Sequence, residues 1–398
     1  MRILEDWLDG YIKYAENSEP PRIFHPWVGI SMLAGALGRK VYTSLGFDTL
    51  YPNLYIVLLA PSGCRKGTAI TIGKQLITPI AGVKVGPQAT TKEMLIKDMA
   101  DCVTMYTDED DQPAWHNSFT QISNELHVFL GKSDVELLAH LCDWYDCISP
   151  WEYRTKNVGV DTINGLCLNF LGATAPKWIP SMFPDEAIGG GVTARMIFIV
   201  AYNLSKLIPN PTLTPEQIAL GQVLVQDLEQ INMIVGEYTK TPEAQEFYAA
   251  WYLKQGANPP LKDPAFSTYC ARRGAHIHKL SMVMAASRHS KTLIELQDLQ
   301  RAIRLLEVAE SKMEQAFVGV GESRYVREMA LVMRYFDAHG RATNRELMEA
   351  LYRDVDPMSM EIVIRTLLLM GKITREEELG GGIVVYNVLE IEGGEKDD

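Results

Sequence analysis

A loop between an apolar segment and a helix-forming segment carries residue types that suit phosphate binding. Backbone N–H groups at a helix N-terminus can donate to phosphate oxygens, and a lysine can neutralise the β and γ phosphates. Here the lysine is Lys66, and Thr68 is the candidate hydroxyl for a magnesium ion. The loop consists of Ala60, Pro61, Ser62, Gly63, Cys64, Arg65, Lys66, Gly67 and Thr68. Its composition and position predict a site for a nucleoside triphosphate with Mg2+.

The loop matches the phosphate-binding pattern GxxxxGK[ST] only in part. Ala60 and Arg65 occupy the two glycine places, and Gly67 occupies the place of the serine or threonine. These departures leave two interpretations open. The segment is a phosphate-binding loop with altered residues, or it is an ordinary polar connection between a strand and a helix.

A second apolar segment, FTQISNEL, ends in polar residues that suit hydrolysis of a phosphate bond. Such hydrolysis needs a group that holds magnesium and a group that positions or activates the attacking water. Glu125 is the candidate base, and Asn124 stands where an aspartate would hold the metal more strongly. The alternative for Glu125 is a surface carboxylate at the start of a helix.

Two further candidates lie beside strand-forming segments. Thr174 ends the segment LCLNFLGAT and could orient the attacking water, or it could cap a helix that begins near Pro176. Arg195 lies between a triple glycine and the apolar segment MIFIV. It could stabilise the charge on a phosphate bound to a neighbouring subunit, or it could form a structural salt bridge.

Basic residues in two other segments are candidates for nucleic-acid and nucleotide contacts. Residues 151–165 alternate in character around a turn, which predicts a hairpin that could hold a DNA backbone. The candidates for that contact are Arg154, Lys156 and Asn157. A plain surface hairpin is the alternative. In the helical region that follows, Arg272 or Arg273 could close over a bound nucleotide.

The order of segments predicts an α/β fold built on a parallel sheet with helices on both faces. Continuous apolar runs such as residues 54–59 fit buried parallel strands, and they alternate with helix-forming segments up to about residue 205. The predicted parts are a helical N-terminal segment (1–50), a P-loop ATPase core (51–210), a helical lid (211–320), a winged-helix domain (321–391) and a disordered tail (392–398).

The winged-helix prediction rests on three helix-forming segments followed by two strand-forming segments around a glycine turn. Residues 323–391 contain nine basic and eleven acidic side chains. A duplex-binding unit would usually be basic. Docking to another protein is therefore at least as good an interpretation of this unit as DNA binding.

Composition limits the classes of protein that the chain can belong to. Its 398 residues carry a net charge of −12, which argues against coating nucleic acid by bulk attraction but leaves room for a local basic channel. The six cysteines form no CxxC pair and are expected to be reduced thiols. Because no apolar run is long enough to span a membrane, we expect a cytoplasmic protein without membrane contacts.

The segments HPWVGISMLAGALGRKV, PNLYIVLLAPSGCRKGTA, SNELHVFL and NFLGATAPKWI together resemble the helicase-type AAA+ proteins of phages and other mobile elements, which are often associated with primases. The resemblance covers roughly residues 20–310. It implies a RecA-like core and a homo-hexameric ring that hydrolyses ATP between subunits and moves along single-stranded DNA during replication. A primase or host replication proteins are the implied partners. The residues in the matching places are Lys66, Thr68, Glu125, Thr174 and Arg195.

The altered loop and Asn124 keep other functions open. An ATP-regulated helicase loader, or a DNA-binding protein that assembles at an origin, would need only weak hydrolysis. A degenerate remnant with a structural role is a third interpretation. Stimulation of ATP turnover by single-stranded DNA would distinguish the helicase from both.

Overall fold

The chain divides into two units, Met1–Phe317 and Val318–Asp398. The computed structural model describes residues 2–131, 134–155, 159–183, 190–317, 325–352, 354–377 and 384–388. The predicted domain boundaries near residues 50 and 210 both fall inside the first unit. Among the described residues, no helix combines the length and the apolar character needed to cross a bilayer.

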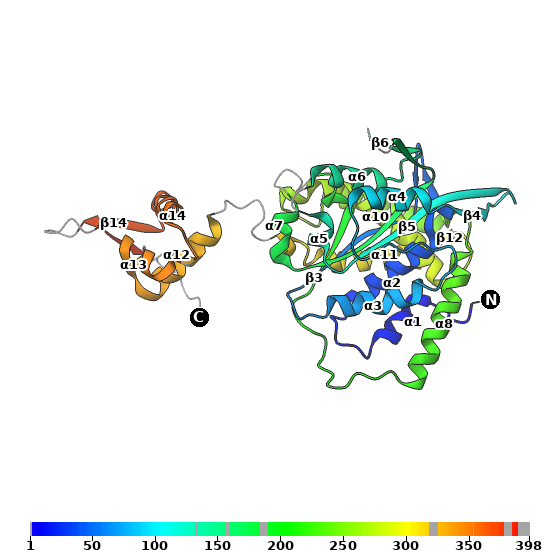
Figure 1. Cartoon of the computed structure of the whole chain (residues 1–398), viewed down its shortest axis with the longest axis horizontal. Coiled ribbons are helices and arrows are strands. Elements are labelled where there is room, and N and C mark those ends of the chain that lie inside the picture. The colour runs from blue at the N-terminus through cyan, green and yellow to red at the C-terminus, as the bar shows by residue number, and fades with distance from the viewer. Residues whose placement is uncertain are drawn as a thin grey trace. The chain divides into compact units, whose positions relative to one another are not determined.

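A five-stranded sheet forms the centre of the first unit (Figure 1). Its strand order is β4-β5-β8-β3-β9, and only β4 runs antiparallel to its neighbour. The strands are β3 (Tyr55–Leu59), β4 (Thr104–Thr107), β5 (Pro113–Ser123), β8 (Leu166–Thr174) and β9 (Met196–Val200). Every residue of β3, β8 and β9 is buried, as the continuous apolar sequences of β3 and β9 predict. The fold is therefore α/β with a mostly parallel central sheet.

Helices cover both faces of this sheet. Side chains of consecutive strand residues point to opposite faces. In β8, Asn169 donates to Ser31 of α2 (Phe24–Leu37), whereas the ring of Phe170 packs on Phe129 of α5 (Leu126–Leu130). Thus α2 and α5 lie on opposite faces.

Helix α2 is buried on nearly all sides because other helices surround it as well as the sheet. Thirteen of its fourteen residues are buried, and it packs against α1 (Trp7–Ala15) and α3 (Lys66–Ile77). A Cβ atom at Gly73 of α3 would lie only 2.4 Å from Val28 of α2. The approach of α2 and α3 therefore requires glycine there.

The remaining helices of the first unit are α4 (Lys92–Asp101), α6 (Val135–Tyr145), α7 (Ile179–Met182), α8 (Pro215–Asn232), α9 (Pro242–Ala257), α10 (Ser267–Arg288) and α11 (Leu296–Glu310). Short strands in the described part of this unit form further small sheets: β1 (Val41–Leu45) and β2 (Asp48–Leu50) with β10 (Gly236–Glu237); β6 (Trp151–Thr155) with β7 (Gly159–Ile163); and β11 (Thr239–Lys240) with β12 (Leu293–Ile294). Strands β1 and β2 correct the expectation that residues 1–50 are helical. Gly46, with a φ of +63°, forms the turn that reverses the chain between them.

In the part of the second unit that the structure describes, three helices accompany a three-stranded antiparallel sheet. Its elements are α12 (Val326–His339), β13 (Arg341–Thr343), α13 (Asn344–Leu351), α14 (Pro357–Leu369), β14 (Ile373–Glu377) and β15 (Val384–Val388). The three predicted helices and the pairing of β14 with β15 are confirmed. A core that includes Val332, Phe336, Leu347 and Val363 joins the helices to the sheet.

Four buried histidines should make the stability of the first unit sensitive to acid. Burial lowers the pKa of these imidazoles from 6.5 to about 4 for His25 and His116, and to about 3 for His276 and His278. Below pH 6.5 the unfolded chain therefore binds protons that the folded chain does not, so stability falls as pH falls. Each histidine should remove about 1.4 kcal/mol of unfolding free energy per pH unit between its two pKa values. Denaturant unfolding between about pH 7 and about pH 5 measures the decline.

The variant His25→Phe is the control for this pH dependence. Phenylalanine has a similar shape but no titrating group. The unfolding free energy of the variant should therefore fall less per pH unit, by the contribution of one histidine. An unfolding free energy that stays constant from about pH 7 to about pH 5 contradicts the prediction.

Candidate functional site

The polar residues predicted from three separate segments come together at one edge of the central sheet. Because β3, β5, β8 and β9 are parallel, their carboxyl ends share this edge. Leu59, the last residue of β3, pairs with Thr174 of β8 and with Val200 of β9. Three parts of the chain therefore lie side by side at this edge: the start of the loop 60–65, the segment after Ser123, and the end of β8. In open α/β sheets, ligands bind at this edge.

The loop 60–65 leads from β3 into the N-terminus of α3. Its first backbone N–H, that of Ala60, donates to the carbonyl of Thr174 over 3.3 Å. Gly63 has a φ of +92°, and a Cβ atom built on it would meet no other atom within 4 Å. Among the described residues, no side chain caps the first turn of α3. The helix thus presents unpaired N–H groups to any anion held by the loop.

Arg65 stands in the place of a glycine but keeps the backbone conformation that a glycine favours. Its φ and ψ are 54° and 30°, in the left-handed region that few non-glycine residues occupy. The side chain points to the N-terminal segment, where Nε lies 2.9 Å from Oε2 of Glu19. The departure at Arg65 therefore changes the side chain without changing the turn.

Lys66 folds back over the loop. Its ammonium donates to the carbonyls of Ala60 and Pro61 over 2.6 and 3.0 Å. Partial burial lowers its pKa, while Glu125 lies near enough to favour the charged form. An ammonium that donates to two neutral carbonyls, beside unpaired N–H groups, can exchange these carbonyls for phosphate oxygens, which bind it more strongly.

The residues after β5 and β8 add oxygen atoms to the same edge. The side-chain oxygens of Asn124 and Thr174 are buried and have no hydrogen-bond partner among the described residues. A buried oxygen left in this state costs about 1–3 kcal/mol, which a water, an ion or a ligand would recover. Asn124 lies next to the loop, because a Cβ atom built on Gly67 would be 3.9 Å from its Cγ. Since Thr174 makes no capping bond to the turn at Pro176, its interpretation as a helix cap is wrong.

Glu125 and Thr68 lie at the open side of this site. Glu125 precedes α5, and its carboxylate is 67% exposed and lies 3.4 Å from Nδ1 of His127. Both interpretations of Glu125, as a base and as a surface carboxylate, agree with this position. Thr68 is exposed on the first turn of α3, two residues after Lys66.

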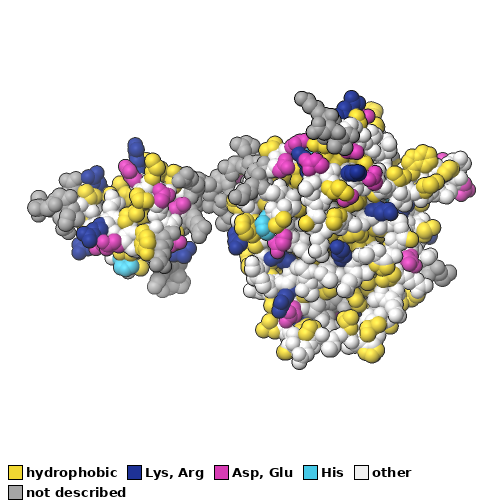
Figure 2. Space-filling model, in the orientation of Figure 1, with side chains coloured by type: hydrophobic (Ala, Val, Ile, Leu, Met, Phe, Trp, Pro, Cys, Tyr) yellow, Lys and Arg dark blue, Asp and Glu magenta, His cyan; other side chains and the backbone are white. Residues whose placement is uncertain are grey.

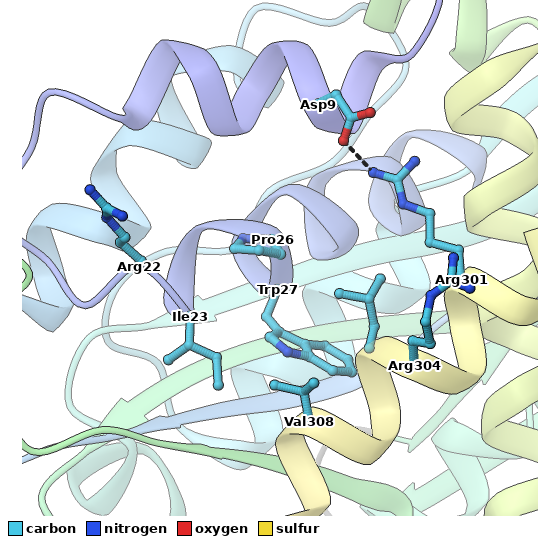
Figure 3. Close-up of a pocket in the computed structure, with 9 residues that line it drawn as sticks. Asp9, Arg22, Ile23, Pro26, Trp27, Arg301, Arg304 and Val308 are labelled. Atoms are coloured by element: carbon cyan, nitrogen blue, oxygen red, sulfur yellow. Dashed lines mark hydrogen bonds and ion pairs between the residues drawn. The ribbon is translucent and has the colours of Figure 1, made fainter.

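A cavity of about 680 Å3 lies beside the N-terminal segment that holds the loop (Figure 3). Arg22 and Ile23, just before α2, line it together with Trp27 of α2 and Val308 of α11. Arg22 lies three positions after Glu19, which is paired with Arg65, so the two Cα atoms are at most roughly 11 Å apart. One residue of the cavity lining therefore lies close along the chain to the residue that pairs with Arg65.

The site therefore combines an uncapped helix N-terminus, a lysine, an exposed carboxylate and two unpaired buried oxygens. No family model and no curated protein matches the chain. A functional assignment consequently depends on the geometry of this sheet edge.

Arg195 does not lie at this edge. It precedes Met196, which pairs with Tyr55 at the amino end of β3. Its guanidinium is buried and forms a two-pronged ion pair with Asp146, and it also donates to the carbonyl of Gly191 over 2.6 Å. In this conformation Arg195 forms the structural salt bridge that was the alternative interpretation.

The two arginines of α10 also lie away from the loop. Arg272 reaches Oδ1 of Asp146 over 3.4 Å, which places it beside Arg195 at the amino edge of the sheet. Arg273 is 2% exposed and forms two hydrogen bonds with Glu310, 2.7 and 2.8 Å long. We therefore correct the expectation that Arg272 or Arg273 closes over a nucleotide in the same subunit.

The hairpin predicted over residues 151–165 is present as β6 and β7. Arg154 is exposed and pairs with Glu152 over 2.8 Å, whereas Lys156 and Asn157 lie outside the described residues. Trp151 packs edge-on against Trp144 of α6, so this aromatic ring serves packing. On the face of the first unit drawn in Figure 2, acidic and basic side chains are interspersed.

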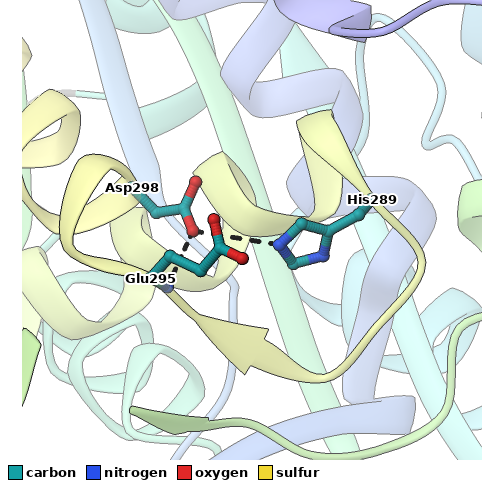
Figure 4. A group of neighbouring side chains, drawn as sticks. All are labelled: His289, Glu295 and Asp298. Atoms are coloured by element: carbon teal, nitrogen blue, oxygen red, sulfur yellow. Dashed lines mark hydrogen bonds and ion pairs between the residues drawn. The ribbon is translucent and has the colours of Figure 1, made fainter. Parts of the chain in front are cut away.

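A cluster that the sequence did not single out joins His289, Glu295 and Asp298 (Figure 4). Their ligand atoms lie within 4.8 Å of one another. However, Arg288 lies 2.6 Å from Asp298 and 3.0 Å from Glu295, and Asp298 also accepts the backbone N–H of Glu295. Because this guanidinium already neutralises both carboxylates, the cluster is better explained as the cap of α11 than as a metal site.

Proposed function

We propose that this chain is an ATP-dependent DNA translocase of the AAA+ type, with the triphosphate held by residues 60–68. The observation that carries the proposal is the uncapped N-terminus of α3, with Lys66 inside it, at the carboxyl end of the buried strand β3. The strand order supports it, because β8 separates β3 from β5, so Thr174 lies between the loop and Glu125.

Each residue at this edge is assigned a separate role in ATP hydrolysis. Lys66 and the N–H groups of α3 bind the phosphates, and Thr68 with Asn124 would hold Mg2+, which neutralises charge on the phosphates. Glu125 activates the attacking water and Thr174 orients it. The base of the nucleotide fits the cavity beside Trp27, whose lining is largely apolar.

A head-to-tail ring, proposed as a homo-hexamer, would complete the site. Lys66 and Arg195 lie at opposite edges of the sheet, so a heterologous contact can set the arginine edge of one subunit against the loop of the next. Arg272, with a side chain 36% exposed, is the more accessible guanidinium there. Arg154 and its hairpin are proposed to contact single-stranded DNA, and the second unit, as a winged helix, to bind DNA or a primase.

The purified full chain tests the proposal directly. We expect saturable binding of Mg–ATP, and hydrolysis that single-stranded DNA accelerates to roughly the 1–100 turnovers per second typical of kinases. Native mass measurement with an ATP analogue and an oligonucleotide should give a ring with DNA bound. Failure to bind any nucleoside triphosphate overturns the proposal.

A second candidate function is an ATP-regulated helicase loader. The observation that favours it is Asn124, an amide in the place where a carboxylate would bind magnesium more strongly. Nucleotide binding with negligible turnover, unchanged by single-stranded DNA, would select the loader over the translocase.

The variant Glu125→Gln should bind ATP normally but hydrolyse it at least about 100-fold more slowly, because general-base catalysis contributes at least this factor. Measurements of nucleotide affinity and of phosphate release separate the two effects. Glu136→Gln is the matched control, since Glu136 is also an exposed carboxylate, 54% accessible, on the adjacent helix α6. Equal rates for Glu125→Gln and the unaltered chain would assign Glu125 to the surface only.

A further inference from the structure

A second cavity of the first unit, about 630 Å3 in volume, is lined by aromatic, aliphatic and polar side chains. It is lined by residues of β1, β10, β11, α9 and α10. None of the lining residues belongs to the loop 60–68 or to the segments that follow β5 and β8. The cavity is therefore distinct from the proposed ATP site.

Two buried side chains in the lining lack hydrogen-bond partners. His278 and Tyr238 are each 1% exposed, and neither ring nitrogen of His278 nor the hydroxyl of Tyr238 has a partner among the described residues. Burial lowers the pKa of His278 to about 3, so at neutral pH its ring has one donor and one acceptor. Such groups rarely stay unpaired in folded proteins, which points to a polar ligand.

Aromatic rings enclose the same cavity. The ring centroid of Tyr248 lies 4.4 Å from that of His278 and 5.8 Å from that of Tyr252. Gly274 of α10 permits this arrangement, because a Cβ atom there would lie 3.0 Å from the hydroxyl of Tyr248. The ammonium of Lys240 lies 5.6 Å from the centre of the Tyr248 ring, and Tyr252 is 47% exposed at the rim.

We propose that this cavity binds a nucleobase, either of a mononucleotide or of a single-stranded oligonucleotide. A nucleobase is planar, stacks on tyrosine, and carries both donors and acceptors on its edges. Those edges match the unpaired nitrogens of His278 and the hydroxyl of Tyr238, while Lys240 can meet a base acceptor or a phosphate. The inference goes beyond the proposed motor function, because this cavity shares no residue with the ATP site.

The test uses the full chain with Lys66→Ala, so that binding at the loop does not contribute. Two calorimetric titrations are made, one series with the four nucleoside monophosphates and one with a single-stranded oligonucleotide. We expect saturable binding either of at least one monophosphate or of the oligonucleotide alone. The first result assigns a mononucleotide site, and the second assigns a nucleic-acid contact. If neither ligand class binds with a Kd below about 1 mM, the proposal is overturned.

Two variants locate the binding. Tyr252→Ala should weaken it about tenfold, since base stacking on one aromatic ring is worth roughly that factor. His278→Phe should abolish it while the thermal midpoint stays unchanged or rises, because the variant removes unpaired buried nitrogens. Phe247→Ala, an aromatic truncation elsewhere on α9, is the matched control and should bind normally. Unchanged affinity in both Tyr252→Ala and His278→Phe would overturn the assignment to this cavity.

Discussion

Replacing Lys66 with alanine is expected to abolish Mg–ATP hydrolysis and DNA unwinding, with a loss of at least about 100-fold in turnover. Removal of a single preorganised donor to a charged transition state typically costs this much or more. The loss should be purely functional, because the ammonium's hydrogen-bond partners among the described residues are two backbone carbonyls, those of Ala60 and Pro61. Phosphate release and strand separation, measured on the same preparations, test the prediction.

Lys74→Ala is the matched control for this experiment. Lys74 lies in the last turn of α3, so the variant removes the same charge from the same helix at its far end. It should leave turnover unchanged. Unwinding that survives Lys66→Ala would mean that the loop 60–68 is not the nucleotide site.

The strands and the loop that form the candidate site can be predicted from the sequence, because each is marked by a pattern of neighbouring residues. Continuous apolar runs predict the buried strands β3 and β9, and a largely apolar run predicts β8. Glycine and lysine between a strand and a helix predict the loop. If the strands are parallel, as predicted, their carboxyl ends share one edge, so Thr174 and Glu125 are also predicted to lie near the loop.

The partners of the arginines could not be predicted, because the pairs form between residues far apart in the chain. Asp146 lies 49 residues before Arg195 and 126 residues before Arg272, and no pattern in the sequence marks that distance. Unpaired buried atoms such as the side-chain oxygen of Asn124 cannot be predicted from the sequence either, since their burial depends on the packing of several segments. Sequence therefore identifies the side chains that could react, whereas only the fold shows which of them are already engaged.

The variant Glu310→Leu is expected to destabilise the first unit by about 3–5 kcal/mol, which is the usual cost of removing one partner from a buried ion pair. Glu310 accepts two bonds from Arg273 and one, 3.1 Å long, from the hydroxyl of Tyr269. Both charged side chains are 2% exposed, so water cannot replace the lost carboxylate. Denaturant unfolding followed by circular dichroism measures the change.

A double variant shows whether the loss comes from the stranded charge of Arg273. Adding Arg273→Leu to Glu310→Leu should recover part of the stability, because two apolar side chains leave no unpaired buried charge. The control Glu152→Leu removes the partner of exposed Arg154 and should cost less than about 1 kcal/mol. If the double variant is less stable than Glu310→Leu, then Arg273 stabilises the first unit through Trp251 and Gln255, its other contacts, more than through its charge pair.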